Sequence, residues 1–304
     1  MTDPVYLDCD TGVDDALALP LLLRTVDLLG VGTVSGNIGA GQAARNTLDL
    51  LALAGRGDVP VAEGARHPID GIFAGGAERV HGGNGIGGVV LPRAGTDPVP
   101  VTAADLLITL ARARPGTLRV LATGPLTNLA VALRREPRLP QLIRDVTVMG
   151  GAVRVPGNVT GHGEANIAGD PEAAAEVLAA GWPVTLVPLD VTMQHRFALA
   201  DQEALRAHGT PLGTALAEML TAYFDHYERV LGERRVPLHD PLAAAVLVGA
   251  VTPADAPMLG LRVDASALRG QVTEDPAAQQ RTRVVLSLTE PAAPVLRRLI
   301  LAGA

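Results

Sequence analysis

Four carboxylates lie close together near the N-terminus, at Asp8, Asp10, Asp14 and Asp15. They stand where an apolar run ends and a helical pattern begins. Helix capping by a first-turn acid would account for one of them. Four neighbouring negative charges repel one another, and a hard cation with oxygen ligands is the simplest means of holding them together. The cluster therefore predicts a metal site.

A second acidic position lies far along the chain, where His239 and Asp240 are followed by Pro241. An apolar run, Leu242 to Ala250, predicts a helix directly after them. Asp240 is suited to cap that helix, with Pro at the first helical position. Capping does not prevent a carboxylate from binding metal. A single histidine is more often a surface or core residue than a catalyst, so His239 is of interest because of its neighbour.

Two further strand ends carry polar groups. Thr123 precedes Gly124 and Pro125, a turn whose backbone carbonyl would face the same crevice, although this is also ordinary turn chemistry. The segment around Met149 leads into a loop that carries amides and a carboxylate. Such groups suit a polyhydroxylated ligand, because sugar hydroxyls need both donors and acceptors. The loop residues of this kind are Asn158, Glu164 and Asn166.

The elements that position these residues alternate between apolar strand-like runs and helical patterns, which indicates an α/β fold. Near-continuous Val, Ile and Leu in the strands predicts a mostly parallel central sheet buried by helices on both faces. Ligands of such sheets bind at the carboxyl ends of the strands. The predicted strands include Pro4 to Cys9, Leu28 to Ser35, Thr117 to Ala122, Asp145 to Met149 and Pro183 to Leu189.

Two long segments interrupt this alternation, residues 64–100 and residues 151–169. Loops of that length in a compact domain are usually lids or binding loops. The tail from Leu259 to Leu288 predicts a late hairpin or strand pair, followed by a short helix from Pro294 to Ala302. Because no linker, repeat or low-complexity tract divides the chain, we expect one domain over residues 1–304.

The composition of the chain limits which classes of partner we expect. The chain has 25 basic residues, all of them Arg, against 32 acids, and a net charge of −7, so a nucleic-acid polymer is not an expected partner. Cys9 lies within an apolar strand, where a small buried hydrophobe is the ordinary interpretation and a catalytic thiol the alternative. With no signal peptide pattern and no apolar run of membrane-spanning length, we expect a cytoplasmic protein without membrane contact.

These pieces, in this order, resemble the inosine-uridine-preferring nucleoside hydrolase family over nearly the whole chain. The opening Asp-Cys-Asp-Thr-Gly-Val-Asp-Asp-Ala is similar to the aspartate fingerprint of that family. The resemblance implies a single nucleoside hydrolase domain with its active site at the carboxyl ends of the strands. It also implies calcium-dependent hydrolysis of the N-glycosidic bond of ribonucleosides, which yields ribose and a free purine or pyrimidine base.

The resemblance further implies residue roles. Calcium would be bound by Asp10, Asp15, the carbonyl of Thr123 and Asp240. Asp10 would be the general base toward a calcium-bound water, and His239 would assist the leaving base. The positions similar to ribose contacts are Asp14, Asn37, Asn158, Glu164 and Asn166, with Met149 lining the sugar pocket.

On the base side, the resemblance implicates His81, Tyr223 and Tyr227. The two tyrosines lie four residues apart on a predicted helix and so share a face, where helix packing is the equal alternative. Two positions depart from the family pattern. Thr11 stands where many members have Pro, which should alter only the turn, and Ala165 stands where an aromatic or larger residue often sits.

Two other functions share parts of this pattern. A phosphatase of the haloacid dehalogenase type has a similar Asp-x-Asp-Thr motif but needs a later lysine, and this chain has none. A non-catalytic nucleoside or sugar sensor would have no use for a water-activating base. The expected assembly is a homo-oligomer, either a dimer or a tetramer. The sequence leaves the preference for purine or pyrimidine nucleosides open.

Overall fold

The computed structural model describes residues 2–304 and is built around one eight-stranded sheet. The strand order is β10-β13-β6-β5-β4-β1-β2-β3, and all neighbours are parallel except β10, which pairs antiparallel with β13. These strands are β1 (Pro4–Cys9), β2 (Asp27–Thr33), β3 (Val61–Glu63), β4 (Leu118–Ala122), β5 (Ile143–Met149), β6 (Val184–Val187), β10 (Met258–Leu259) and β13 (Thr282–Val284).

Three two-stranded antiparallel sheets complete the β structure. They pair β7 (Arg196–Ala198) with β8 (Arg235–Pro237), β9 (Pro253–Asp255) with β14 (Ser287–Leu288), and β11 (Leu261–Asp264) with β12 (Gln271–Glu274).

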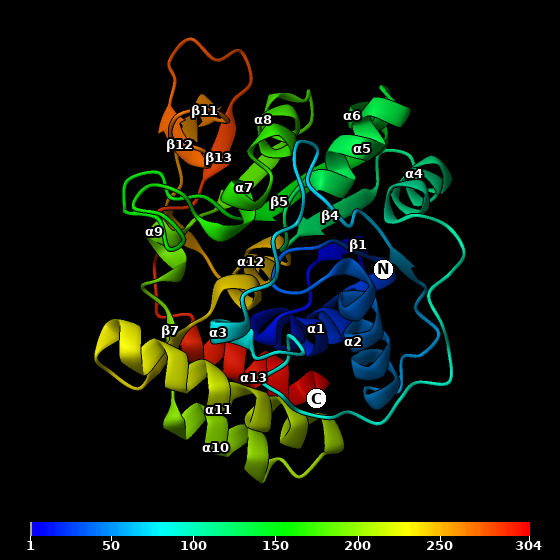
Figure 1. The fold of residues 1–304 in the computed structure, drawn as a ribbon, viewed down its shortest axis with the longest axis vertical. Coiled ribbons are helices and arrows are strands. Elements are labelled where there is room, and N and C mark those ends of the chain that lie inside the picture. Colours follow the sequence, from blue (N-terminus) through cyan, green and yellow to red (C-terminus); the bar gives the residue numbers. More distant parts are fainter. Residues whose placement is uncertain (1) are drawn as a thin grey trace.

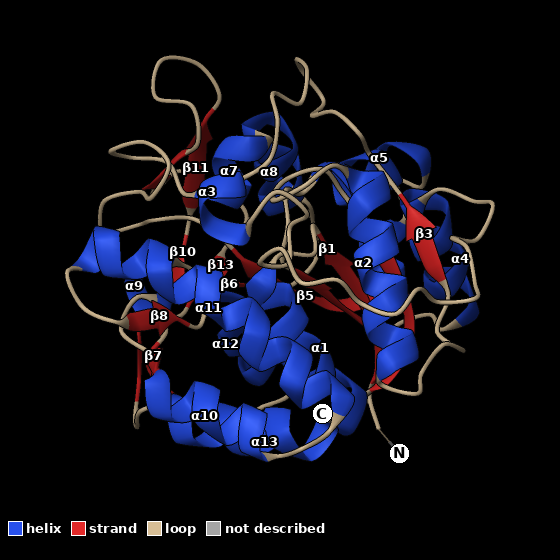
Figure 2. Ribbon diagram, turned by 60° about the horizontal axis from the view of Figure 1, so that its bottom comes forward, coloured by secondary structure: helices blue, strands red, loops and turns tan. Residues whose placement is uncertain are grey.

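Helices surround the main sheet, as Figures 1 and 2 show. They are α1 (Val13–Thr25), α2 (Ala40–Leu53), α3 (Glu78–His81), α4 (Ala103–Ala113), α5 (Thr127–Arg135), α6 (Leu139–Leu142), α7 (Ala165–Gly169), α8 (Pro171–Ala179), α9 (Leu189–Thr192), α10 (Leu199–Ala207), α11 (Pro211–Leu231), α12 (His239–Leu247) and α13 (Ala293–Gly303). No helix within residues 2–304 combines the length and apolarity that a bilayer crossing requires.

The core consists of two apolar layers, one on each face of the sheet. Strand β1 shows the division, because Val5, Leu7 and Cys9 pack into one layer while Tyr6 packs into the other. The first layer contains buried residues of α1, α11, α12 and α13, and the second contains those of α4, α5 and α8. Burial on both faces explains the continuous apolar runs of the strands. Cys9 is free and buried, in agreement with its ordinary interpretation.

The chain reverses its direction of travel across the sheet between β1 and β4. From β1 it adds β2 and β3 on one side, and then β4, β5 and β6 on the other. A crevice forms at such a switch point, outside the carboxyl ends of the strands, because the connections leave in opposite directions. The acidic segment after β1 and the Thr123 turn after β4 both border this crevice. The predicted fold class, an α/β domain with a mostly parallel sheet, is confirmed.

Two predicted elements differ in the structure. The tail does form the β11–β12 hairpin, but it also places β13 beside β6 and β10 at the edge of the main sheet. The predicted late hairpin therefore describes only part of this tail. The strand that pairs with β13 lies about a hundred residues earlier in the chain, so local sequence could not reveal it. The helix expected from Leu242 starts at His239, so Asp240 lies in its first turn instead of capping it. Pro241 is tolerated there because first-turn amides have no helical partner.

Candidate active site

Part of the acidic cluster predicted from the sequence converges on the crevice and is buried. Asp8 does not join it, because its carboxylate accepts hydrogen bonds from the Tyr6 hydroxyl at 2.9 Å and from the side-chain amide of Asn128. Oxygens of Asp14, Asp15 and Asp240 all lie within 4.8 Å of one another, although Asp240 comes from the distant helix α12. Asp15 accepts hydrogen bonds from the Gly12 amide at 2.7 Å and from the Thr123 hydroxyl at 2.7 Å. This grouping contains Asp14, which the resemblance had placed with the ribose contacts.

Asp10 stands at the edge of this group and is held by one residue. The backbone amide of Asn37 donates to Oδ2 of Asp10 at 2.7 Å, and its side-chain amide donates to Oδ1 at 3.0 Å. Burial raises the pKa of Asp10 well above its ordinary value, and the charge of Asp15 raises it further. Two bonds leave further lone pairs on the carboxylate free. Asp10 is therefore a fixed carboxylate with capacity to accept a proton.

The cluster has the chemistry of a cation site. Oδ1 of Asp14 and Oδ2 of Asp240 are buried without any hydrogen-bond partner. Burial, and after it the charges of the neighbouring carboxylates, raise the pKa of Asp240 well above normal and that of Asp15 to about 7. An unpaired buried carboxylate oxygen is costly, and a hard divalent cation with oxygen ligands would satisfy that of Asp240, which leaves the Asp14 oxygen for a ligand hydroxyl. The residues present thus fit a metal ion of the calcium type.

His239 is buried directly before Asp240 on α12 and has a partner on each ring nitrogen. Its Nδ1 is 2.8 Å from the hydroxyl of Thr192 on α9, and its Nε2 is 3.0 Å from the hydroxyl of Tyr227 on α11. Burial lowers the pKa of His239 to about 4, so its imidazole is neutral near pH 7. The ring is fixed in orientation and connected through Tyr227 to the cavity.

His81 and Tyr223 stand beside Asp14. The backbone amide of Val13 donates to Nδ1 of His81 at 3.1 Å, so the proton of the neutral ring lies on Nε2. Burial lowers the pKa of His81, which favours that neutral form. The ring of Tyr223 lies 5.5 Å from that of His81, and its hydroxyl donates to Asp14 at 3.3 Å. The tyrosines of α11 therefore face the site as well as packing the helix.

The residues predicted to contact the sugar also form hydrogen bonds with the backbone around the site. Glu164 is buried and accepts hydrogen bonds from the amides of Gly151, Asn166 and Ile167, which fixes the start of α7. Burial raises the pKa of Glu164, and these amide bonds oppose that shift. The side-chain amide of Asn166 donates to the carbonyls of Thr123 at 2.9 Å and Met149 at 3.1 Å. Its oxygen has no protein donor among these bonds and is available to a ligand.

A cavity of about 410 Å³ brings most of the predicted residues together. Asp10 borders a second cavity, and Asp15 borders a small third cavity together with Cys9 and Thr11. The predicted residues that line the first cavity are Asp14, Asn37, His81, Thr123, Met149, Asn158, Glu164, Asn166, Tyr223, Tyr227, His239 and Asp240. We call it the nucleoside cavity.

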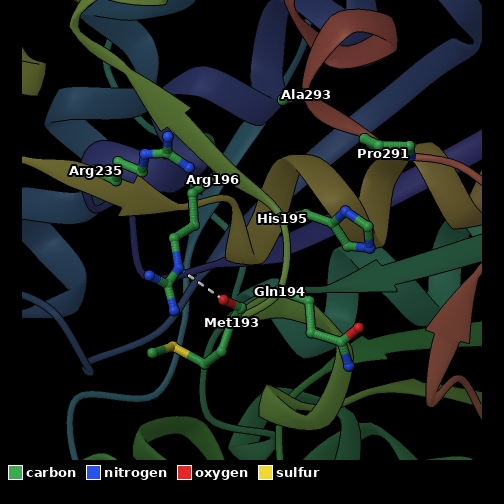
Figure 3. A pocket seen from close by; sticks show the side chains of 7 residues that line it. All are labelled: Met193, Gln194, His195, Arg196, Arg235, Pro291 and Ala293. Atoms are coloured by element: carbon green, nitrogen blue, oxygen red, sulfur yellow. Dashed lines mark hydrogen bonds between the residues drawn. The ribbon is translucent and has the colours of Figure 1, made fainter. Parts of the chain in front are cut away.

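A separate cavity of about 280 Å³ lies behind one wall of the site, and Met193 borders both. Figure 3 shows the side chains around it, with Arg196 bonded to the carbonyl of Met193 at 2.8 Å. The carbonyl of His195 accepts a hydrogen bond from the amide of Leu238, directly before His239. None of the predicted site residues lines this cavity. Its residues support the wall that carries Thr192 and His239.

Sequence reasoning missed several residues that shape the site. Thr192 anchors His239, while Leu189, His226 and Val230 line the nucleoside cavity. Thr192 lies in a four-residue helix that carries no motif. The side chain of Thr123 was also missed, since only its carbonyl had been considered. A signal existed for His226 alone, because it precedes Tyr227 on a helix already placed near the base.

Comparison with known proteins agrees with this geometry. The family model described as inosine-uridine preferring nucleoside hydrolase matches residues 5–293. A pyrimidine-specific ribonucleoside hydrolase of Citrobacter koseri is 39% identical over 82% of this chain and 80% of its own. A probable uridine nucleosidase of Oryza sativa is 36% identical over 81% of this chain and 76% of its own.

Solved structures extend the likeness to the whole fold. A purine-preferring ribonucleoside hydrolase from Gardnerella vaginalis superposes with a TM-score of 0.92 at 32% identity, over 99% of this chain and 97% of that one. A plant nucleoside hydrolase gives a TM-score of 0.92 at 28% identity, over 100% of this chain and 99% of that one. The chain therefore belongs to the inosine-uridine preferring nucleoside hydrolase family, whose members act on N-glycosyl bonds.

Proposed function

We propose that this chain hydrolyses ribonucleosides to ribose and a free base, with water activated by Asp10 and the leaving base assisted by His239. The observation that carries the proposal is the arrangement of two unlike groups around one crevice. The buried carboxylates Asp14 and Asp240 line one cavity together with the hydrogen-bonded pair of His239 and Tyr227. Cleavage of an N-riboside develops positive charge on the sugar and negative charge on the base, so each end meets a complementary environment.

At the sugar end, Asp10 accepts the proton of the attacking water. Asn37 holds both of its oxygens and so fixes the direction in which a proton can arrive. A carboxylate fixed in this way can take a proton from a water that approaches its free lone pairs. Asp15, the Thr123 carbonyl and Asp240 would hold Ca²⁺ together with Asp10. When bound there, the ion would supply positive charge that orients water and makes it easier to deprotonate.

The ribose hydroxyls need partners of both kinds. Asp14 offers an oxygen without a partner, and Asn166 offers its side-chain oxygen. Asn158 keeps its side-chain amide for a donor role, because its oxygen accepts from the Ala165 amide at 3.0 Å. The mixture of acceptors and one donor matches a sugar that carries several hydroxyls.

At the base end, His239 acts together with Tyr227. The imidazole is held by Thr192 on one side and bonded to the tyrosine hydroxyl on the other, so a proton that the ring takes up from water can pass through that hydroxyl to the departing base and leave the ring neutral again. The Nε2 proton of His81 adds a donor on the same side. Water attack on one face with base departure from the other requires no covalent intermediate.

The relatives do not agree on the base. The relatives named above include a pyrimidine-specific ribonucleoside hydrolase and a probable uridine nucleosidase, while a well-superposed structure is that of a purine-preferring enzyme. A panel of uridine, cytidine, inosine, adenosine and guanosine therefore tests the proposal. Release of free base and reducing sugar from at least one of them is expected. If none is hydrolysed by the calcium-loaded protein, the proposed function is wrong.

A further inference from the structure

Asn128 lies in the first turn of α5 and is buried, and it has no role in the reaction described above. Its side chain forms hydrogen bonds with three separate segments. The amide nitrogen donates to the carboxylate of Asp8 at 3.1 and 3.2 Å and to the carbonyl of Thr33 at 3.0 Å. The amide oxygen accepts from the backbone amide of Ala65 at 2.8 Å. These partners fix the orientation of the side chain, because the reversed amide would place its oxygen against two acceptors.

The first two segments carry the proposed base and the residue that orients it. Asp8 lies on β1, which leads directly to Asp10. Thr33 is the last residue of β2, and Asn37 lies on the loop between β2 and α2. Asn128 therefore connects the strand that presents the base to the loop whose Asn37 binds both oxygens of that base.

A second route leads from Asn128 to the same loop through Ala65. The carbonyl of Ala65 accepts a hydrogen bond from the amide of Ser35 at 3.0 Å, two residues before Asn37. The hydroxyl of Ser35 in turn accepts from the amide of Ala40 at 3.0 Å. The start of the loop is thus held by one side chain in two ways, directly at β2 and indirectly through residue 65.

The surroundings of Asn128 are closely packed. A Cβ on Gly64 would lie 2.2 Å from the amide oxygen of Asn128 and 2.5 Å from the carbonyl of Thr33, so only a glycine permits this approach of the chain. Asn128 and Asp8 are both almost fully buried. Removal of the amide would therefore leave buried polar groups of three segments without this partner, and such groups would shift to find another.

We propose that Asn128 is a positioning residue for the general base, because it fixes the loop of Asn37 relative to Asp10. Asn128 borders neither the nucleoside cavity nor the second cavity, so it acts through other residues. It keeps the two amides of Asn37 where they hold the carboxylate. A base that is displaced from the attacking water loses part of its effect, since the reaction depends on the geometry of approach. This inference rests on the proposed function, because it concerns the same base.

A double-mutant cycle between Asn128 and Asn37 tests the inference. Asn128→Ala should lower kcat of the calcium-loaded protein by roughly tenfold and change KM by less than about threefold. The loss should be equal for the accepted natural nucleoside and for p-nitrophenyl riboside, because both reactions need the base. In the Asn37→Ala background, the same substitution should lower kcat by less than about threefold, because residues of one hydrogen-bond network are not additive.

Gln202→Ala is the matched control. Gln202 is also a buried amide, and its nitrogen donates to the carbonyl of Ala217 at 2.7 Å and to the hydroxyl of Thr221 at 3.0 Å. Its loss removes a comparable set of buried bonds on α10, outside the loop of Asn37. It should leave kcat on p-nitrophenyl riboside within about twofold of the unaltered protein, although the fold loses stability. Thermal unfolding of both variants shows whether they lose stability to a similar extent.

Every outcome decides between a positioning role and a structural one. Equal loss factors in the two backgrounds, or a loss of kcat in Gln202→Ala as large as that in Asn128→Ala, would overturn the inference. If Asn128→Ala does not fold, as judged by circular dichroism, the cycle is measured with Asn128→Asp, which has a similar size and loses both donated bonds. Non-additive losses with Asn37→Ala are expected there too, and additive losses would overturn the inference.

The same measurements separate this inference from the proposed function. An unaltered protein that cleaves no ribonucleoside would remove the proposed function, and this inference with it. An active protein in which the two substitutions act independently would remove the positioning role of Asn128 alone.

Discussion

Asn37 binds both carboxylate oxygens of Asp10, through its backbone amide at 2.7 Å and its side-chain amide at 3.0 Å. The residue lies on the loop after β2, so the strand next to β1 orients the proposed base. A carboxylate held at two points cannot rotate away from an approaching water. The side chain expected to contact ribose is thus also a positioning residue for Asp10.

Asn37→Ala should lower kcat by roughly tenfold or more, since a misplaced base loses part of its catalytic effect. The backbone amide remains in the variant, so Asp10 keeps one of its two bonds. The loss should be similar for a natural nucleoside and for p-nitrophenyl riboside, because the base serves both. Ser35→Ala, on the same loop, is the matched control. A pure rise in KM would identify Asn37 as a ribose contact alone.

His239→Ala should slow inosine or uridine hydrolysis by roughly 10²-fold, the usual scale for losing a general acid. Hydrolysis of p-nitrophenyl riboside should be nearly spared, because p-nitrophenolate departs without protonation. Thr192→Val, which removes the anchor at Nδ1 while keeping the side-chain shape, should have a smaller effect of the same kind. Asp10→Asn should impair both substrates. If His239→Ala lowers the rate equally on the two substrates, His239 has a structural role beside Asp240 and does not assist the leaving base.

Metal removal should abolish hydrolysis and also destabilise the fold. Without a cation, the buried carboxylates of Asp14, Asp15 and Asp240 lie close together and repel one another. Ca²⁺ at about a hundred times its Kd should raise the thermal midpoint by roughly 5 to 10 °C. Differential scanning calorimetry of chelated and reloaded protein measures this shift, and elemental analysis verifies the metal content. Full activity in verified metal-free protein would contradict the assignment.

A 2′-deoxynucleoside should be a poorer substrate than its ribonucleoside by roughly 10²-fold in kcat/KM. Asp14 has a buried oxygen without a partner, and loss of the hydroxyl would leave that group unsatisfied in the complex. Uridine and deoxyuridine, or inosine and deoxyinosine, form the test pair. Comparable efficiency within a pair would remove the basis for the ribose assignment of Asp14.

Thr11 should be intolerant of proline in this chain. Its φ is +27°, which the proline ring cannot adopt, and its hydroxyl lies 2.7 Å from that of Thr47 on α2. The sequence interpretation, that Thr in place of Pro alters only the turn, therefore omits this bond. Thr11→Pro should lower the free energy of unfolding by more than about 1 kcal/mol beyond the loss in Thr11→Ala. Urea denaturation measures both, and equal losses would refute the argument from φ.

The sequence by itself determined the fold class and the strand ends that carry chemistry. The boundaries of β1 follow from the apolar run Pro4–Cys9, because local periodicity and turn residues fix where such a strand begins and ends. The position of Asp10 at a strand end placed it at the ligand-binding edge before any contact was known. The residues next to Asp240 in the sequence were enough to make it a candidate site residue.

The tertiary structure decided how these residues meet. The bond between Tyr227 and His239 joins α11 to α12, and that between His239 and Thr192 joins α12 to α9. The tertiary structure also decided the pairing of β13 with β6 and the cavity beside Ala165. Each depends on contacts between segments distant in the chain. Local sequence carries no signal for them, because their stability arises only when packing brings both partners out of water together.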